Sequence, residues 1–102
     1  MAVMMVMSWA GVTAEEYDDV RGKVAWETDP PSGGVFHIAS FDEQGLHVCD
    51  IWDSADQFDR FVNDRLMRCV KEVGIGGEPD VGIYPVHAVW SPDSQRAGSL
   101  TR

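Results

Sequence analysis

The sequence is poor in basic residues, cysteine and long apolar runs, and each shortage excludes a class of function. Eight Lys and Arg stand against 17 Asp and Glu, for a formal net charge of −9. This sign opposes binding to nucleic-acid phosphates or to anionic membranes. The two cysteines, Cys49 and Cys69, form no CxxC motif, so we expect reduced thiols in a cytoplasmic protein. The apolar start MAVMMVMSWAG is too short to span a bilayer, and we expect it to form a buried strand.

The sequence does contain enough apolar material for a packed core. Of its 102 residues, 44% are hydrophobic, and they include four Trp and four Phe. This length corresponds to one domain. We therefore expect a single domain over residues 1–90 and a polar, mobile tail over residues 91–102.

Apolar spacing and turn residues predict the element order β-α-β-β-α-β. Thr13 and Glu16 have the spacing of a capping box, which predicts a helix start. Pro85 cannot donate a ladder hydrogen bond, so the strand that contains it should lie at a sheet edge or bulge. The predicted elements are a strand over 2–9, a helix over 14–26, strands over 35–41 and 46–52, a helix from the Ser54 cap to Val73, and a strand over 81–90.

This order predicts an α+β fold of ferredoxin-like topology, in which a four-stranded antiparallel sheet carries both helices on one face. The strands hold more apolar side chains than two helices can cover. An exposed apolar sheet face marks an interaction site, so we expect a homodimer packed sheet against sheet. The apolar strand residues behind this expectation are Val35, Phe36, Ile38, Val48, Ile51, Val81, Ile83, Val86 and Val89.

The segments GGVFHIASF and GLHVCDIWDSADQFDRFV, with the closing YPVHAVW, resemble the antibiotic-biosynthesis-monooxygenase-like proteins of the dimeric α+β barrel superfamily. The resemblance spans residues 2–90 and implies a dimeric α+β barrel. It does not imply one reaction, because this superfamily includes quinone-forming oxygenases, heme degraders and polyketide cyclases. The Asn, Trp and His of the heme degraders have no counterpart here, since Phe61 and Lys71 stand at the Trp and His positions. Trp52 and either Tyr17 or Tyr84 correspond only by residue type to the Trp and Tyr of the cofactor-free oxygenases.

Strand parity predicts a polar cluster on the hairpin. If a tight turn sets Phe41 opposite Leu46, then His37 lies opposite Asp50, on the sheet face that also carries Trp52. A neighbouring carboxylate fixes the tautomer of a histidine and orients it as a general base. An indole ring supplies a flat apolar wall for an aromatic ligand. We therefore predict His37 and Asp50 as the catalytic residues.

Two alternatives to this cluster stay open. A bulge at Gly45 would slip the register and move Asp50 to the opposite sheet face. With the register as predicted, the bond between His37 and Asp50 could also serve only to stabilise the hairpin. The same register sets Val35 opposite Trp52.

The ligand is expected to contact apolar and aromatic side chains near this pair. The candidates are Trp52, Phe58, Phe61, Leu66, Tyr84 and His87. A histidine or tyrosine on an apolar strand is often a core or interface residue, and this alternative holds for Tyr84 and His87. His47 and Cys49 share a strand face without a third ligand nearby, so we predict no metal and no cofactor.

Two functions remain open on this basis. The first is a small enzyme acting on an aromatic or polyketide-like substrate, as a cofactor-independent monooxygenase or a cyclase/isomerase, with His37 removing a phenolic or α-carbonyl proton. The second is a non-catalytic dimer that binds a small apolar molecule or serves as an accessory subunit. Heme binding through His37 or His87 is a third interpretation.

Overall fold

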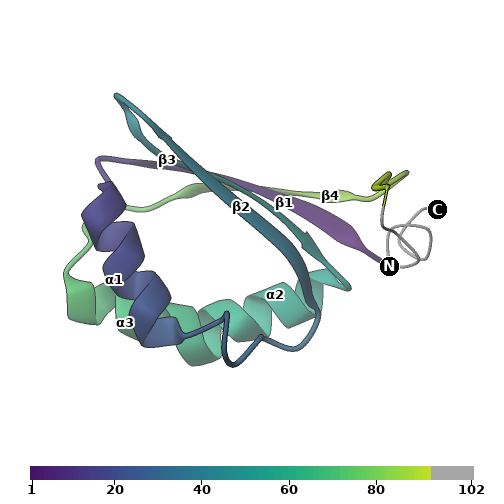
Figure 1. Cartoon of the computed structure of the whole chain (residues 1–102), viewed down its shortest axis with the longest axis horizontal. Helices are drawn as coiled ribbons and strands as arrows, with labels where there is room; N and C mark the ends of the chain where they lie inside the picture. Colours follow the sequence, from purple (N-terminus) through teal and green to yellow (C-terminus); the bar gives the residue numbers. More distant parts are fainter. Residues whose placement is uncertain (93–102) are drawn as a thin grey trace.

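The computed structural model describes residues 1–92, which form a four-stranded antiparallel sheet with the helices on one face (Figure 1). The strands are β1 (Val3–Ala10), β2 (Gly34–Asp42), β3 (Gly45–Trp52) and β4 (Asp80–Pro85). The helices are α1 (Ala14–Val24), α2 (Ala55–Phe61) and α3 (Met67–Val73), with a π-helical segment η1 (Val62–Leu66) between the last two. The strand order β2-β3-β1-β4 confirms the predicted α+β class. The predicted mobile tail lies, from residue 93 onward, outside the described residues.

Helix α1 begins where the capping box predicts it. The Thr13 hydroxyl accepts a hydrogen bond from the Glu16 N–H at 3.1 Å, and the Thr13 N–H donates to the Glu16 carboxylate at 3.0 Å. The helix ends at Val24, before the predicted residue 26, because Ala25 takes the left-handed conformation with φ of 59°. None of the helices in the described part of the chain is long and apolar enough to cross a membrane.

The second predicted helix is interrupted by a π-helical turn. The Ser54 hydroxyl caps its start by accepting from the Gln57 N–H at 3.2 Å, and Gly74 ends it with φ of 89°. Within η1, Arg65 points to the end of α1, where its Nη2 donates to the carbonyl oxygens of Val24 and Asp29, each at 2.8 Å. The π turn therefore ties the second helix to the loop that follows the first.

The β2–β3 hairpin has the predicted register. Phe41 pairs with Leu46, and His37 pairs with Asp50. Gly45 has φ of 143°, and an added Cβ there would collide with the carbonyl oxygen of Trp9. Glycine is therefore required at this position. The turn contains no bulge at Gly45, so Asp50 stays on the same sheet face as His37.

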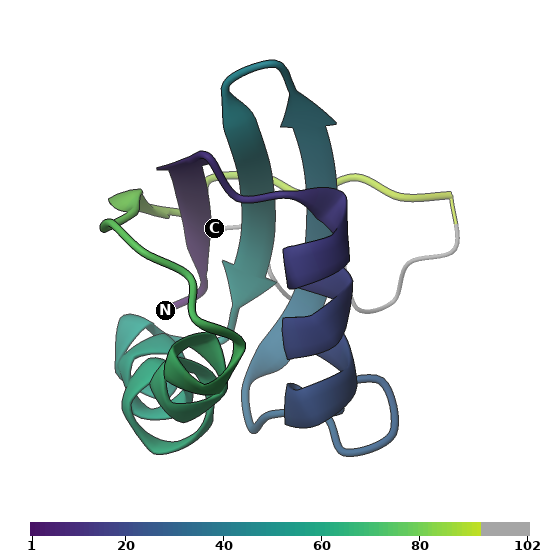
Figure 2. The same ribbon diagram turned by 90° about the vertical axis from the view of Figure 1, so that its left-hand side faces the viewer.

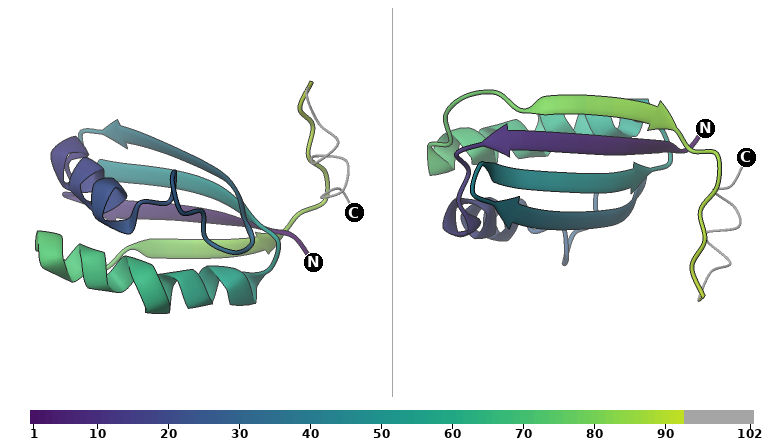
Figure 3. Two further views of the ribbon diagram at one scale, coloured as in Figure 1. Left: turned by 60° about the horizontal axis from the view of Figure 1, so that its bottom comes forward. Right: turned by 90° about the horizontal axis from the view of Figure 1, so that it is seen from above.

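One predicted residue pairing and one predicted strand end are wrong. Gly34, and not Val35, pairs with Trp52, because a β-bulge between Gly34 and Phe36 inserts one residue. Strand β4 ends at Pro85 and does not reach residue 90, since proline lacks the N–H that would continue the ladder. The segment after β4 turns away from the sheet (Figure 3). Strand β4 is nevertheless an edge strand, as Pro85 predicted.

The two faces of the sheet differ in how they are covered. Along β1 the residues alternate between buried and exposed, so within a single chain the expected burial of this strand holds for one face only. The face without helices, which we call the open face, is visible in Figure 3. Phe36 and Ile38 are each 53% exposed on it. Strand pairing places Met4, Val6, Phe36, Ile38, Cys49, Ile51 and Tyr84 on this face.

Candidate active site

A cavity of about 220 Å³ lies between the covered face of the sheet and the helices. Its wall is mostly apolar and includes Met5, Met7, Val48, Phe58, Phe61 and Leu66. The polar side chains that converge on it are Tyr17, His37, Asp50 and Trp52. Helix α1 lies over β2, which brings Tyr17 to the hairpin (Figure 2). An apolar cavity with a few convergent polar groups is the usual form of a small-molecule site.

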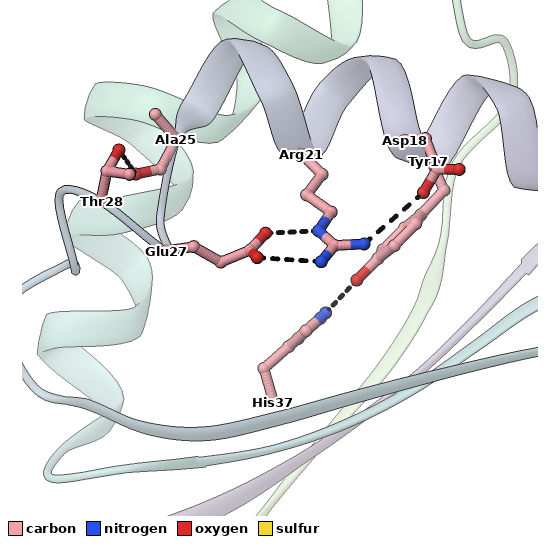
Figure 4. A network of polar contacts seen from close by, with 7 residues as sticks. All are labelled: Tyr17, Asp18, Arg21, Ala25, Glu27, Thr28 and His37. Atoms are coloured by element: carbon pink, nitrogen blue, oxygen red, sulfur yellow. Dashed lines mark hydrogen bonds and ion pairs between the residues drawn. The ribbon is translucent and has the colours of Figure 1, made fainter.

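The four polar side chains form one chain of hydrogen bonds, which we call the Tyr17–Trp52 chain. Tyr17 Oη lies 2.6 Å from His37 Nε2, as Figure 4 shows. His37 Nδ1 lies 2.6 Å from Asp50 Oδ1, and Trp52 Nε1 donates to Asp50 Oδ2 at 3.0 Å. The Asp50 side chain is 8% exposed and that of His37 is 32% exposed. The Tyr17–Trp52 chain therefore runs from the mouth of the cavity into the core.

The directions of these hydrogen bonds follow from the Trp52 donor together with Asp50 as a carboxylate. An indole N–H can only donate, and an ionised carboxylate can only accept. Asp50 therefore accepts from both Trp52 and His37, which places a proton on His37 Nδ1. In the neutral imidazole this leaves Nε2 as the acceptor, so the Tyr17 hydroxyl donates to it. The buried carboxylate thus fixes the histidine tautomer.

Aromatic rings hold His37 in place. The Trp26 ring centroid lies 5.1 Å from that of His37. The Tyr17 ring is within 6° of parallel to the imidazole at 6.0 Å, and it meets Phe41 edge-on at 5.7 Å. Deeper in the cavity Trp52 packs on Phe58 and Phe61, at centroid distances of 5.5 Å and 5.3 Å. These contacts restrict the rotation of the imidazole and of the indole, so the donor and acceptor positions are fixed before a ligand binds.

Charged side chains surround the Tyr17 hydroxyl on the solvent side (Figure 4). Arg21 is held by Glu27 through two hydrogen bonds, of which the one from Nη2 is 2.9 Å long. Burial raises the pKa of Tyr17, and the nearby Arg21 charge partly opposes this effect. The hydrogen bond from Arg21 lowers the pKa of Glu27. Tyr17 is therefore a neutral phenol at neutral pH.

No protein-family model matches the chain, and no curated protein matches it. Solved structures do share its fold. NE2512 from Nitrosomonas europaea, a protein of unknown function, has a TM-score of 0.66 at 15% identity, over 91% of this chain and 95% of its own. SnoaB from Streptomyces nogalater, a cofactor-independent oxygenase, has a TM-score of 0.59 at 13% identity, over 91% and 97%. A candidate antibiotic biosynthesis monooxygenase from Deinococcus radiodurans has a TM-score of 0.57 at 12% identity, over 92% and 100%.

The chain has the antibiotic-biosynthesis-monooxygenase-like fold. This confirms, for the fold, the resemblance carried by the hairpin and the helix that follows it. At identities of 15% and below the likeness extends to the fold and does not fix an activity. The case for an activity therefore rests on the residues of this chain.

Within this fold most of the predicted site residues come together. His37, Asp50 and Trp52 join in one hydrogen-bonded chain, and Phe58, Phe61 and Leu66 line the same cavity. Tyr84 and His87 do not line it, which corrects their predicted place. Tyr84 pairs with Met4 on the open face, and His87 follows the end of β4 and is exposed. Both nitrogens of His37 are hydrogen-bonded, Nε2 to Tyr17 and Nδ1 to Asp50.

Two residues of the cavity have little signal in the sequence. Tyr17 lies on the helical stripe of Val20 and Val24, which indicates that it faces the sheet but not that it reaches His37. Trp26 follows the end of α1, and only the left-handed turn at Ala25 directs it back to the imidazole. Among residues 1–92 no group of three His, Cys, Asp or Glu is placed to hold a metal.

Proposed function

We propose that the protein is a small acid–base enzyme that removes a proton from an aromatic or polyketide-like substrate, as a cofactor-independent monooxygenase or a cyclase. The observation that carries this proposal is the buried Asp50 carboxylate 2.6 Å from His37 Nδ1, at the wall of an apolar cavity. A carboxylate in this position stabilises the imidazolium that forms when histidine takes a proton. SnoaB, which shares the fold, is a cofactor-independent oxygenase, and this supports the same class of chemistry.

The proposed first step is proton abstraction from a phenolic O–H or from a C–H next to a carbonyl. His37 becomes an imidazolium, and the substrate becomes a delocalised anion against the flat ring of Trp52. In the monooxygenase, the anion adds dioxygen and a proton to give a hydroperoxide, whose O–O bond then breaks to leave a carbonyl on the substrate and release water. In the cyclase, the anion attacks a second carbonyl and no oxidant is needed. Exclusion of water by Phe58 and Phe61 strengthens the electrostatic interactions within the cavity.

The size of the cavity indicates the size of the substrate. At about 220 Å³ it is smaller than the roughly 300–1,000 Å³ of sites for drug-sized ligands. We therefore propose a substrate of one or two fused rings, or a larger one whose remainder extends out of the mouth beside Tyr17 and His37.

The test uses 2-tetralone, a two-ring ketone with acidic α-hydrogens, and needs neither the natural substrate nor dioxygen. Proton NMR in D₂O measures how fast these hydrogens exchange for deuterium. The wild-type protein should accelerate the exchange, and His37→Gln should lower that acceleration by about 10²–10⁴-fold, the usual contribution of a general base. Exposed His87→Gln is the matched control and should exchange at the wild-type rate. Equal rates for wild type and His37→Gln would contradict the proposal.

A non-catalytic ligand-binding protein is the second candidate. Every buried polar side-chain atom in residues 1–92 has a hydrogen-bond partner, and the Tyr17–Trp52 chain is complete without a ligand. A structural role for His37 and Asp50 would have the same appearance. Saturable binding of 2-tetralone without exchange would favour this candidate over the enzyme.

We also propose that the protein is a homodimer closed through the open face. The supporting observation is an exposed apolar surface that continues across all four strands of the sheet. Exposed apolar patches of this kind usually mark an interface, and a symmetric pair would cover both copies at once. The cavity lies on the other side of the sheet and stays accessible in such a dimer.

A further inference from the structure

The Tyr17 hydroxyl covers the one atom of His37 that could accept a proton. The Nδ1–H group donates a hydrogen bond to Asp50, so Nε2 is the only basic position of the neutral ring. Tyr17 Oη lies 2.6 Å from that atom. The two rings are almost parallel and the bond joins their edges, so the hydroxyl covers the lone pair of Nε2. A substrate therefore meets the tyrosine oxygen before it meets the imidazole.

The Tyr17 oxygen keeps a free acceptor position. A phenol has one proton to donate and lone pairs left to accept. Its proton is given to His37, and among residues 1–92 nothing donates a hydrogen bond back to the oxygen. Tyr17 lines the same cavity as Trp52 and Phe58. The vacant acceptor therefore belongs to a residue in the wall of the cavity where the ligand would lie.

We propose that Tyr17 is a further catalytic residue, which relays the substrate proton to His37. The Tyr17 oxygen takes the proton from the substrate while the Tyr17 O–H proton passes to His37 Nε2. One substrate O–H or C–H bond breaks and a new Tyr17 O–H bond forms; the old Tyr17 O–H bond breaks and an Nε2–H bond forms. The products are the substrate anion and an imidazolium beside Asp50, and Tyr17 is neutral before and after. This role rests on the proposed function of His37.

The electrostatic surroundings of Tyr17 favour a relay over a permanent phenolate. Burial raises the pKa of Tyr17, and Asp18, Glu27 and Asp50 act in the same direction, so the phenol keeps its proton at neutral pH. The Arg21 charge acts in the opposite direction, and Glu27 fixes its position through two hydrogen bonds. A nearby cation stabilises the negative charge that develops briefly on the oxygen during the transfer.

The test compares Tyr17→Phe with Tyr84→Phe in the 2-tetralone exchange. Tyr84 is an exposed tyrosine on the open face and serves as the matched control. The relay predicts that Tyr17→Phe lowers the maximal exchange rate by about 10²-fold or more, with little change in 2-tetralone affinity, and that Tyr84→Phe is unaffected. A Tyr17→Phe rate equal to or above that of wild type would overturn the relay, because His37 would then take the proton directly.

The outcomes separate this role from the proposed function. Exchange that is lost in His37→Gln but kept in Tyr17→Phe refutes the relay alone, whereas no exchange in the wild type refutes both. A second variant with 3-fluorotyrosine at position 17 guards against loss of folding, since it keeps the hydroxyl and nearly the same shape. Fluorine makes the phenol more acidic. In a plot of exchange rate against pH, the change that marks ionisation of Tyr17 on the alkaline side, which we call the alkaline limb, should therefore move to lower pH. An unchanged limb would overturn the relay.

Discussion

Asp50→Asn should lower the rate of proton abstraction on the order of 10⁴-fold, which is the scale seen when the carboxylate behind a catalytic histidine becomes an amide. The amide has the shape of the carboxylate but only one accepting oxygen. If that oxygen serves Trp52, the NH₂ group faces His37 Nδ1 and forces the ring proton to Nε2. Nε2 then donates and can no longer accept a proton through Tyr17.

The other orientation of the amide is unfavourable. Its NH₂ group would face the Trp52 N–H, leaving a buried donor unsatisfied at a cost of about 1–3 kcal/mol. We therefore expect the tautomer switch, with a melting temperature near that of wild type. Deuterium exchange into 2-tetralone measures the loss, and exposed Asp59→Asn on α2 is the matched control. A variant that keeps the wild-type rate would show that Asp50 does not set the tautomer.

Ile38→Glu should convert the proposed dimer into a folded monomer. Ile38 is 53% exposed on the open face of a single chain. In a symmetric dimer the substitution buries two unpaired carboxylates, each at a cost of several kcal/mol, so Kd should rise by at least roughly 10³-fold. Sedimentation velocity at micromolar concentration measures the change in mass.

The control for this variant is Met67→Glu, which adds the same charge to an exposed apolar residue on the helical side of the molecule. It should leave the dimer mass unchanged. A wild-type protein that sediments as a well-folded monomer would contradict the proposed dimer. A dimeric Ile38→Glu variant would show instead that the interface lies elsewhere on the surface.

Local chemistry explains why much of the fold was predictable. Thr13 with Glu16 marks a helix start, and Gly74 with positive φ marks a helix end. The partner of His37 was predictable because the period of two residues along a strand, together with a tight turn at Gly45, leaves few registers. The bulge at Val35 was not predictable, since no glycine or proline at that position signals it.

Contacts between distant elements explain what the sequence did not show. The bond from Tyr17 to His37 joins a helix to a strand, and its existence depends on the tilt of α1 over the hairpin. Trp26 reaches the imidazole only because Ala25 is left-handed and Arg65 holds the turn from η1. Tyr84 and His87 miss the cavity for different reasons, since Tyr84 lies on the open face of β4 and His87 lies beyond the end of that strand. Sequence spacing describes neighbours along one element and not across two.

The state of the His37 ring tests the central claim most directly. Nitrogen-15 NMR of the imidazole should show the proton on Nδ1 and a hydrogen-bonded, unprotonated Nε2 in the free protein. Binding of 4-nitrophenol, an acidic phenol with a coloured anion, should protonate Nε2 and bring up the absorbance of the bound phenolate. A free protein with its proton on Nε2, or a bound phenol that stays neutral while His37 is unchanged, would contradict the account.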